Sequence, residues 1–379
     1  MIHPEIFFNC LTQSGVGLFS GVPDSLLKNV CAYITDNTTP DEHIIAANEG
    51  NALAIGIGYH LASNKIPLIY MQNSGLGNIV NPLLSLADSE VYSIPIVLLI
   101  GWRGEPGVKD EPQHKKQGRV TRNLLDSMEI PYELLTPDMD AIKAEQMLQR
   151  IVYKSKAQKK PCALLVRNGS FSDYKLQTDK IYVRPLLREQ ALEKIVSELD
   201  ERDIVVSTTG VTSRELFEFR EKQGQGHEKD FLTVGGMGHA SQIALGIAIQ
   251  KKNRQVFCLD GDGALLMHMG ALAINASMGC KNFKHIVFNN SAHDSVGGQP
   301  TVADQIDIQN IALSSGYRWV KQASTPESIQ IAVKELRATS GPAFLEIQVK
   351  TGFRSNLGRP TITPIENKKA FMAFQSKND

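Results

Sequence analysis

The chain has 379 residues, of which 42% are hydrophobic, and its 40 basic and 40 acidic side chains give a formal charge of zero. This length exceeds that of one ordinary domain, so we expect two domains of about 150–200 residues each. Nucleic acids and anionic membranes attract proteins with an excess of basic residues, and this chain has no such excess. We therefore expect neither a nucleic-acid partner nor a membrane partner.

The chain also lacks the usual marks of export. Residues 1–11, MIHPEIFFNCL, have no basic segment and no long apolar core like those of a signal peptide. Apolar runs such as 94–101 are far shorter than the ~20 residues that span a bilayer. The five cysteines show no CxxC spacing, which favours free thiols in a reducing compartment over disulfides or zinc ligands. These features predict a cytoplasmic protein.

Short apolar runs alternate with helix-like segments along the whole chain. The runs that we interpret as strands are 43–48, 67–74, 95–102, 162–168, 203–210, 255–263, 285–291 and 342–349. Apolar strands separated by amphipathic helices are typical of a parallel sheet covered on both faces. The polar stretch 170–190 lacks this periodicity and predicts a linker. We expect an α/β fold with one parallel sheet in each of two domains, 1–175 and 176–379.

Polar side chains follow two neighbouring strands in the second half. In VFCLDGDGALLMHMG and the later HIVFNNS, Asp262 follows one strand, Asn290 ends the next, and a single helix at 264–280 is expected between them. In a parallel sheet these strand ends share the edge at which ligands bind. Gly261 and Gly263 allow tight turning and close approach of N–H groups to an anion. A carboxylate, an amide oxygen and a nearby backbone carbonyl suit Mg²⁺ beside a phosphate group.

The pattern Gly261-Asp262-Gly263, followed by Asn289-Asn290, resembles the diphosphate-binding motif of thiamine-diphosphate enzymes. The resemblance implies that Asp262, Asn290 and the backbone carbonyl of Ala292 hold Mg²⁺ against the diphosphate. This family usually has glycine or another small residue at the last position, so the carbonyl ligand survives the change. The resemblance further implies cofactor contacts from residues of two strand ends: Thr208, Thr209, Gly210, Gly261, Gly263 and Ala264.

Two further segments fit the same resemblance. Glu49, in AANEGNALAIGIGYHLA, resembles the glutamate that binds the aminopyrimidine ring and promotes deprotonation of the thiazolium carbon C2. The stretch TVGGMGHASQIALGIA, 233–248, resembles the glycine-rich turn that bends the cofactor. There the carbonyl of Gly235 would accept a hydrogen bond from the 4′-amino group, and Met237 would support the bent form.

The length narrows the choice within this family. Many members carry a third domain between the two cofactor-binding domains, and 379 residues leave no room for it. Nearly the whole chain resembles the phosphonopyruvate decarboxylases, in the stretches 19–27, 71–88, 101–121, 235–248 and 289–301. This resemblance implies decarboxylation of 3-phosphonopyruvate to phosphonoacetaldehyde and CO₂, in phosphonate biosynthesis of the 2-aminoethylphosphonate type.

Two alternatives stay open. The N-terminal stretches are shared with the sulfopyruvate decarboxylases, whose substrate differs by roughly one charge at neutral pH. The chain could also be a catalytically silent subunit that binds the cofactor for structure or sensing. Intact Glu49, Asp262 and Asn290 argue against a silent subunit.

A small acidic 2-oxo acid requires cationic or N–H-rich surroundings. The segment DEPQHKKQGR, 110–119, which we interpret as a loop, offers such groups. The residues expected near the substrate are Asp24, Ser25, His114, Lys115, Arg119 and Asp294. His114 and His293, together with Glu49, are the candidates for proton transfer near C2.

Glu49 and the motif at 235–292 fall in different predicted domains. In thiamine-diphosphate enzymes such sites are completed across subunits. The resemblance therefore implies a homodimer or a larger homo-oligomer with active sites at the subunit interfaces.

Overall fold

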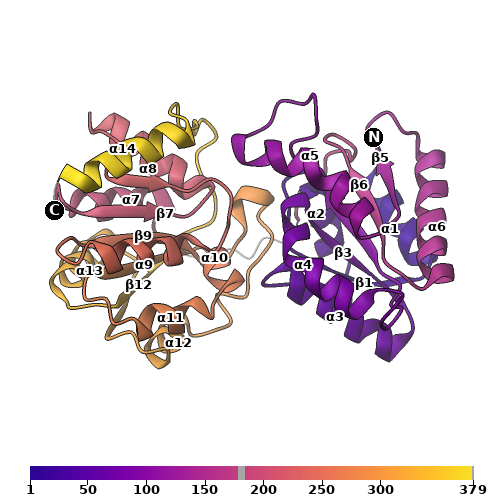
Figure 1. Ribbon diagram of the computed structural model, residues 1–379, viewed down its shortest axis with the longest axis horizontal. Helices are drawn as coiled ribbons and strands as arrows, with labels where there is room; N and C mark the ends of the chain where they lie inside the picture. The colour runs from indigo at the N-terminus through magenta and orange to yellow at the C-terminus, as the bar shows by residue number, and fades with distance from the viewer. Residues whose placement is uncertain (178–183, 378–379) are drawn as a thin grey trace. The chain divides into compact units, whose positions relative to one another are not determined.

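The computed structural model describes residues 1–177 and 184–377 (Figure 1). Internal contacts divide the chain into two compact units, residues 1–180 with 296–299, and residues 181–295 with 300–379. Each unit contains a six-stranded sheet in which every pairing is parallel, which confirms the predicted α/β fold. Part of the predicted linker, residues 178–183, lies outside the described residues. The assignment of domains to 1–175 and 176–379 stays a prediction.

The sheet of the first unit has the strand order β2-β1-β3-β4-β6-β5. Its strands are β1 Val16–Gly21, β2 His43–Ile45, β3 Ile66–Gln72, β4 Val97–Gly101, β5 Tyr132–Leu135 and β6 Cys162–Val166. Its helices are α1 Pro4–Gln13, α2 Lys28–Asp36, α3 Glu49–Ser63, α4 Leu76–Pro82, α5 Pro112–Ser127 and α6 Ala141–Gln158, with the short turns η1 Asn73–Gly75 and η2 Leu83–Ala87.

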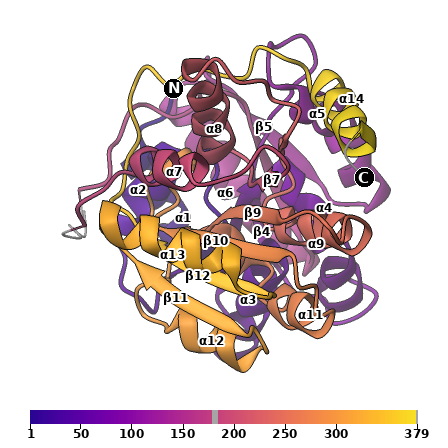
Figure 2. The same ribbon diagram turned by 90° about the vertical axis from the view of Figure 1, so that its left-hand side faces the viewer.

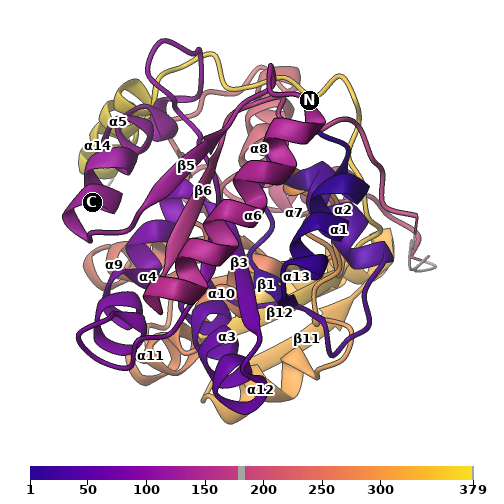
Figure 3. The same ribbon diagram turned by 90° about the vertical axis from the view of Figure 1, so that its right-hand side faces the viewer.

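Helices cover both faces of this sheet. Helices α1, α2 and α6 pack on one face with Val97 and Leu99 of β4, whereas α3, α4 and α5 pack on the other with Leu98 and Ile100. Figure 3 shows α1 and α6 side by side on their face. Because alternate residues of β4 enter two different cores, the strand is apolar throughout.

The second unit repeats this design with the strand order β11-β12-β10-β9-β7-β8. Its strands are β7 Ile204–Ser207, β8 Asp230–Leu232, β9 Val256–Gly261, β10 Phe283–Asn289, β11 Trp319–Ala323 and β12 Ala343–Gln348. Its helices are α7 Arg188–Ser197, α8 Val211–Lys222, α9 Ala240–Gln250, α10 Asp262–Met267, α11 Ala271–Ser277, α12 Ile308–Ser314, α13 Pro326–Ala338 and α14 Pro364–Lys377, with the short turn η3 Asp294–Val296.

In this unit α7, α8 and α13 share one core, and α9, α11, α12 and α14 contribute to the other (Figure 2). In the described part of the chain, no helix has both the length and the hydropathy that crossing a membrane requires.

Two local predictions were wrong. The predicted loop 110–119 is mostly the start of α5, because Pro112 stands in the first helical turn and His114, Gly118, Thr121 and Leu125 form a buried face. The single helix expected at 264–280 is two helices, α10 and α11, with a turn over residues 268–270 between them. Four strands, β1, β5, β8 and β11, were not among the predicted runs.

The central strands should carry most of the stability of the first unit. Leu99, in β4, is 0% exposed, whereas Leu61, on α3, is 70% exposed. Leu99→Ala should lower the free energy of unfolding by about 2–5 kcal/mol, since it leaves a cavity between packed layers. The matched change Leu61→Ala should alter it by less than about 0.5 kcal/mol. Urea denaturation followed by circular dichroism would compare the two, and equal midpoints would contradict the packing described.

Candidate functional site

The predicted cofactor residues of the second unit lie at one edge of its sheet. Thr208 follows β7, Asp262 follows β9, and Asn290 follows β10, and β9 pairs with both other strands. The parallel arrangement brings these strand ends together. The hydroxyl Oγ1 of Thr209 accepts a hydrogen bond from the N–H of Gly235 at 2.8 Å, which ties the end of β7 to the turn after β8.

Asp262 is a buried carboxylate at this edge, with 3% exposure. Burial raises its pKa to about 6, although hydrogen bonds from Thr301 and from the N–H of Gly263 oppose the shift. The Thr301 hydroxyl donates to Oδ2 at 2.6 Å. A divalent cation at this position would favour the ionised carboxylate and offset the cost of burial.

The amide of Asn290 is held in a fixed orientation. Its Nδ2 donates to Oδ2 of Asp294 at 2.6 Å, and its Oδ1 accepts from the N–H of Ala292 at 3.1 Å. An amide oxygen has a second lone pair, which suits a cation ligand. Together with the Asp262 carboxylate and the Ala292 carbonyl, this is a set of oxygen donors that fits Mg²⁺.

Asp294 is itself fixed by charged partners that the sequence did not suggest. Arg188 donates to Asp294 at 3.4 Å and to both oxygens of Glu215 at 2.9 and 3.2 Å. The N–H of Gly352 also donates to Asp294, at 3.1 Å. Asp294 thus orients Asn290, and its predicted contact with the substrate stays a prediction.

The glycine-rich turn packs closely against the start of α10. A Cβ at Gly238, where φ is +86°, would lie 2.6 Å from the ring of His268 and 3.0 Å from the carbonyl oxygen of Ala264. A Cβ at Gly263 would lie 2.9 Å from the ring of His293 and 3.3 Å from Cε of Met237. The structure therefore brings Met237, Gly263 and His293 together, and only glycine fits at positions 238 and 263.

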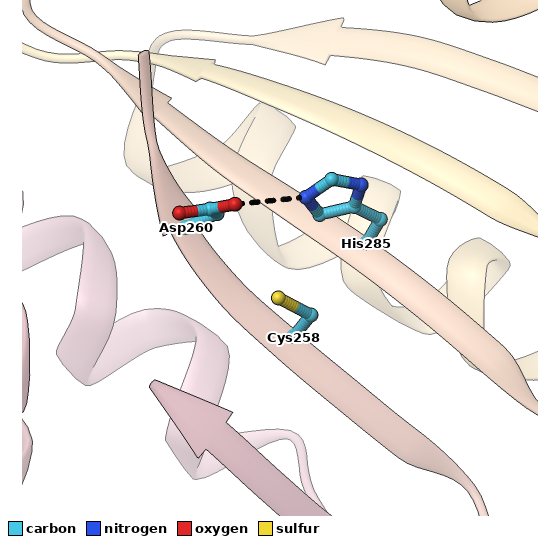
Figure 4. A group of neighbouring side chains, drawn as sticks. All are labelled: Cys258, Asp260 and His285. Carbon is cyan, nitrogen blue, oxygen red and sulfur yellow. Dashed lines mark hydrogen bonds and ion pairs between the residues drawn. The ribbon is translucent and has the colours of Figure 1, made fainter. Parts of the chain in front are cut away.

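A buried polar group lies below this edge, on β9 and β10 (Figure 4). Cys258, Asp260 and His285 are buried, with their possible ligand atoms all within 4.8 Å of one another. His285 Nε2 lies 3.4 Å from Asp260 Oδ2, and Asp260 Oδ1 accepts a hydrogen bond from the N–H of Gly261 at 3.0 Å. The pair thus supports the turn that carries Asp262, a role that the sequence analysis missed.

Glu49 is buried at the start of α3 in the first unit. Asn78 Nδ2 donates to its Oε2 at 2.7 Å, and a Cβ at Gly75 would lie 2.5 Å from its Oε1. Gly75 therefore leaves space for this carboxylate, and Asn78 fixes its position through a hydrogen bond. Glu49 and the metal-ligand candidates belong to different units.

A second cluster in the first unit contains several of the predicted substrate residues. Asp24 follows β1, Gln72 ends β3, and Arg103 follows β4, so all three lie at the carboxyl ends of adjacent strands. Gln72 Nε2 donates to Asp24 Oδ1 at 2.7 Å, and Arg103 Nη1 donates to the hydroxyl of Ser25 at 2.6 Å.

Asp110 joins Arg103 to His114 in this cluster. Arg103 donates to both carboxylate oxygens of Asp110, at 2.9 and 2.5 Å, and His114 Nδ1 lies 2.9 Å from Oδ1. Lys115 and Arg119 lie on the exposed side of α5 and do not join them. Arg103 and Asp110 were not among the predicted site residues, although Arg103 follows the predicted strand at 95–102 directly.

The cluster fixes several ionisation states. Burial raises the pKa of Asp24. Burial also acts to raise the pKa of Asp110, but Arg103, His114 and the N–H of Gly104 outweigh it and hold that pKa well below its usual range. Burial lowers the pKa of His114, and Asp110 only partly opposes this. In the second unit, burial lowers the pKa of His293 to about 4. Both histidines are therefore neutral at neutral pH.

Known families match both units. A family model described as the thiamine pyrophosphate enzyme N-terminal TPP binding domain matches residues 3–129, and the C-terminal TPP binding domain matches residues 208–347. Phosphonopyruvate decarboxylase from Streptomyces viridochromogenes is 35% identical, over 96% of this chain and 92% of its own.

Two further relatives also match the full chain. Phosphonopyruvate decarboxylase from Streptomyces hygroscopicus is 34% identical, over 100% of this chain and 95% of its own. Sulfopyruvate decarboxylase from Methanosarcina acetivorans is 26% identical, over 100% of this chain and 98% of its own. The match with the phosphonopyruvate enzymes is the stronger one.

Replacing two glycines near this site by alanine should change the free energy of unfolding in opposite directions. One glycine lies on the turn and the other inside α9. Gly238→Ala meets the contacts described at positive φ and should lower the free energy of unfolding by about 1–3 kcal/mol. Gly246→Ala, inside α9 with open space around its Cβ, should raise it by about 0.5–1 kcal/mol. Thermal unfolding of both variants would test this, and a neutral Gly238→Ala would contradict the close packing of the turn.

Proposed function

Because this chain belongs to the thiamine pyrophosphate enzymes, in the family of the phosphonopyruvate decarboxylases, we propose that it converts 3-phosphonopyruvate into phosphonoacetaldehyde and CO₂. The observation that carries the proposal is the similarity to two such enzymes over nearly the whole chain. The reaction would serve phosphonate biosynthesis of the 2-aminoethylphosphonate type.

The cofactor is thiamine diphosphate, and we propose Mg²⁺ as its metal partner. Asp262, Asn290 and the carbonyl of Ala292 would hold the metal. The strand-end residues Thr208, Thr209, Gly210, Gly261, Gly263 and Ala264 would surround the diphosphate, and Gly235 and Met237 would meet the pyrimidine. When bound, the cofactor supplies a carbanion that attacks the ketone and an electron sink as CO₂ leaves.

The chain's own residues would bind, orient and move protons. Glu49 would exchange a proton with the aminopyrimidine, while Asn78 holds one of its oxygens in place. His114 and His293 are the proposed groups for returning a proton to the product carbon. Asp24, Ser25, Lys115, Arg119 and Asp294 are the remaining proposed contacts with the substrate.

Glu49 and the proposed metal ligands belong to different units, and the resemblance to thiamine-diphosphate enzymes, whose sites are completed across subunits, supports a site completed by two chains. We propose a homodimer or larger homo-oligomer in which Glu49 of one subunit meets residues 235–292 of another. The cytoplasm is the proposed location, since the cysteines are free and four of the five are buried.

The substrate preference can be measured directly. CO₂ release from 3-phosphonopyruvate should exceed that from sulfopyruvate, and it should vanish when thiamine diphosphate or Mg²⁺ is omitted. Preference for sulfopyruvate would favour the second candidate function, which the Methanosarcina relative supports. No turnover of either substrate despite cofactor binding would favour a silent subunit.

Glu49 should be essential for this turnover. Glu49→Gln keeps the size and the contact with Asn78 but removes the carboxylate, so kcat should fall by about 100-fold or more. The matched change Glu90→Gln, at an exposed position, should leave kcat unchanged. Equal activity of the two variants would rule out the proposed proton exchange.

A further inference from the structure

The cluster around Asp110 has a donor and acceptor pattern that distinguishes two kinds of acidic head group. Asp110 is held ionised by Arg103, so its carboxylate can only accept hydrogen bonds. The short contact of 2.9 Å between His114 Nδ1 and Asp110 Oδ1 therefore requires a proton on Nδ1. In neutral His114 the other ring nitrogen, Nε2, is then a bare acceptor.

This acceptor remains available for a ligand. In the described part of the chain, no side chain or backbone group pairs with Nε2, and the His114 side chain keeps 11% exposure. His114 stays neutral at neutral pH because burial lowers its pKa. The charged groups that act on it are Asp110, Arg103 and Asp24.

Arg103 supplies donors beside this acceptor. A guanidinium group has five N–H donors, and those engaged here are Nε–H toward Asp110, one on Nη1 toward Ser25, and one on Nη2 toward Asp110. No other described residue bonds the remaining two N–H groups, on a side chain that is 17% exposed. Arg103 and His114 both contact Oδ1 of Asp110, so the two side chains lie beside the same carboxylate oxygen.

We propose that His114, with its tautomer fixed by Asp110, selects a phosphonate over a sulfonate head group by accepting the hydrogen bond of a P–OH at Nε2, while Arg103 donates to the other head-group oxygens. The inference rests on the proposed function, since it takes the substrate's head group to lie beside α5. It identifies Asp110 as a positioning residue and His114 as the specificity residue, and in this role His114 would leave the return of the proton to the product carbon to His293.

The physical basis is the proton that only one of the two head groups can carry. A phosphate group loses its second proton at a pKa of about 6, so a related phosphonate shares a proton readily near neutral pH. A sulfonate is a strong acid and has none to share. Beside a sulfonate, the Nε2 lone pair would face oxygen lone pairs with no proton between them. Sites that hydrogen-bond a ligand O–H group reject ligands without that group.

The test compares the ratio of kcat/KM for 3-phosphonopyruvate to that for sulfopyruvate. His114→Gln keeps the Arg103–Asp110 pair but presents an amide that both donates and accepts, so the ratio should fall about tenfold or more. Asp110→Asn should lower it similarly, because the asparagine amide can donate to Nδ1 and move the ring proton to Nε2. Asp126→Asn, an exposed change on the same helix, should leave the ratio unaltered.

The pH dependence of this ratio provides a second test of the proposal. As the pH falls through the lowered pKa of His114, below its ordinary value of about 6.5, Nε2 gains a proton and can donate to a sulfonate. The ratio for the unaltered enzyme should then approach the ratio for His114→Gln. Both enzymes are measured at the same pH, so that the ionisation of the substrates affects both ratios equally.

A spectroscopic measurement reads the tautomer independently of turnover. In protein labelled with [¹⁵N]histidine, the His114 signals should show the Nδ1–H form, and Asp110→Asn should shift them toward the Nε2–H form. Turnover with a ratio unchanged in both variants, or an Nε2–H tautomer in the unaltered enzyme, would overturn this inference alone. No turnover of either substrate by the unaltered enzyme would overturn the proposed function as well.

Discussion

The carboxyl edge of a parallel sheet determines where the candidate site residues of this protein gather. Within each sheet all strands run in the same direction, so the polar residues that follow the strands gather at one edge of each unit. In the first unit, Asp24 and Arg103 reach this edge, and in the second, Asp262 and Asn290 do so. Because the strands themselves are buried on both faces, these ends are the first positions at which the chain can present polar groups to a ligand.

At both edges, buried charged side chains are fixed by hydrogen bonds to a partner, and that partner is fixed by a further hydrogen bond. Arg188 pairs with Glu215 and also with Asp294, which orients the amide of Asn290. Removing charges from water is costly, and such pairs are weak evidence for stability. Their benefit here is orientation, since a ligand oxygen that must meet a metal cannot be left to rotate. Asp262 has no comparable cationic partner among its described hydrogen bonds, which is the setting that a metal ion would complete.

The sequence predicted the fold class and several of the polar residues that follow the strands, because both are local patterns. Central strands such as β4 read as continuous apolar runs, whereas the edge strand β11 has exposed residues and gives no such signal. The helix α5 was missed because its basic residues cover an amphipathic pattern. Asp110 and Glu215 could not be assigned from the sequence, since their roles depend on Arg103 and Arg188, which are brought near only by folding.

The central proposal for this protein is a cofactor site that two chains complete. Chains carrying Glu49→Gln and chains carrying Asp262→Asn, each inactive alone, should be mixed, unfolded and refolded together. In a mixed dimer one site receives both intact halves, so random pairing in equal amounts should restore about a quarter of the activity of the unaltered enzyme. Failure to recover any activity, with mixed dimers demonstrably formed, would contradict a site shared between subunits.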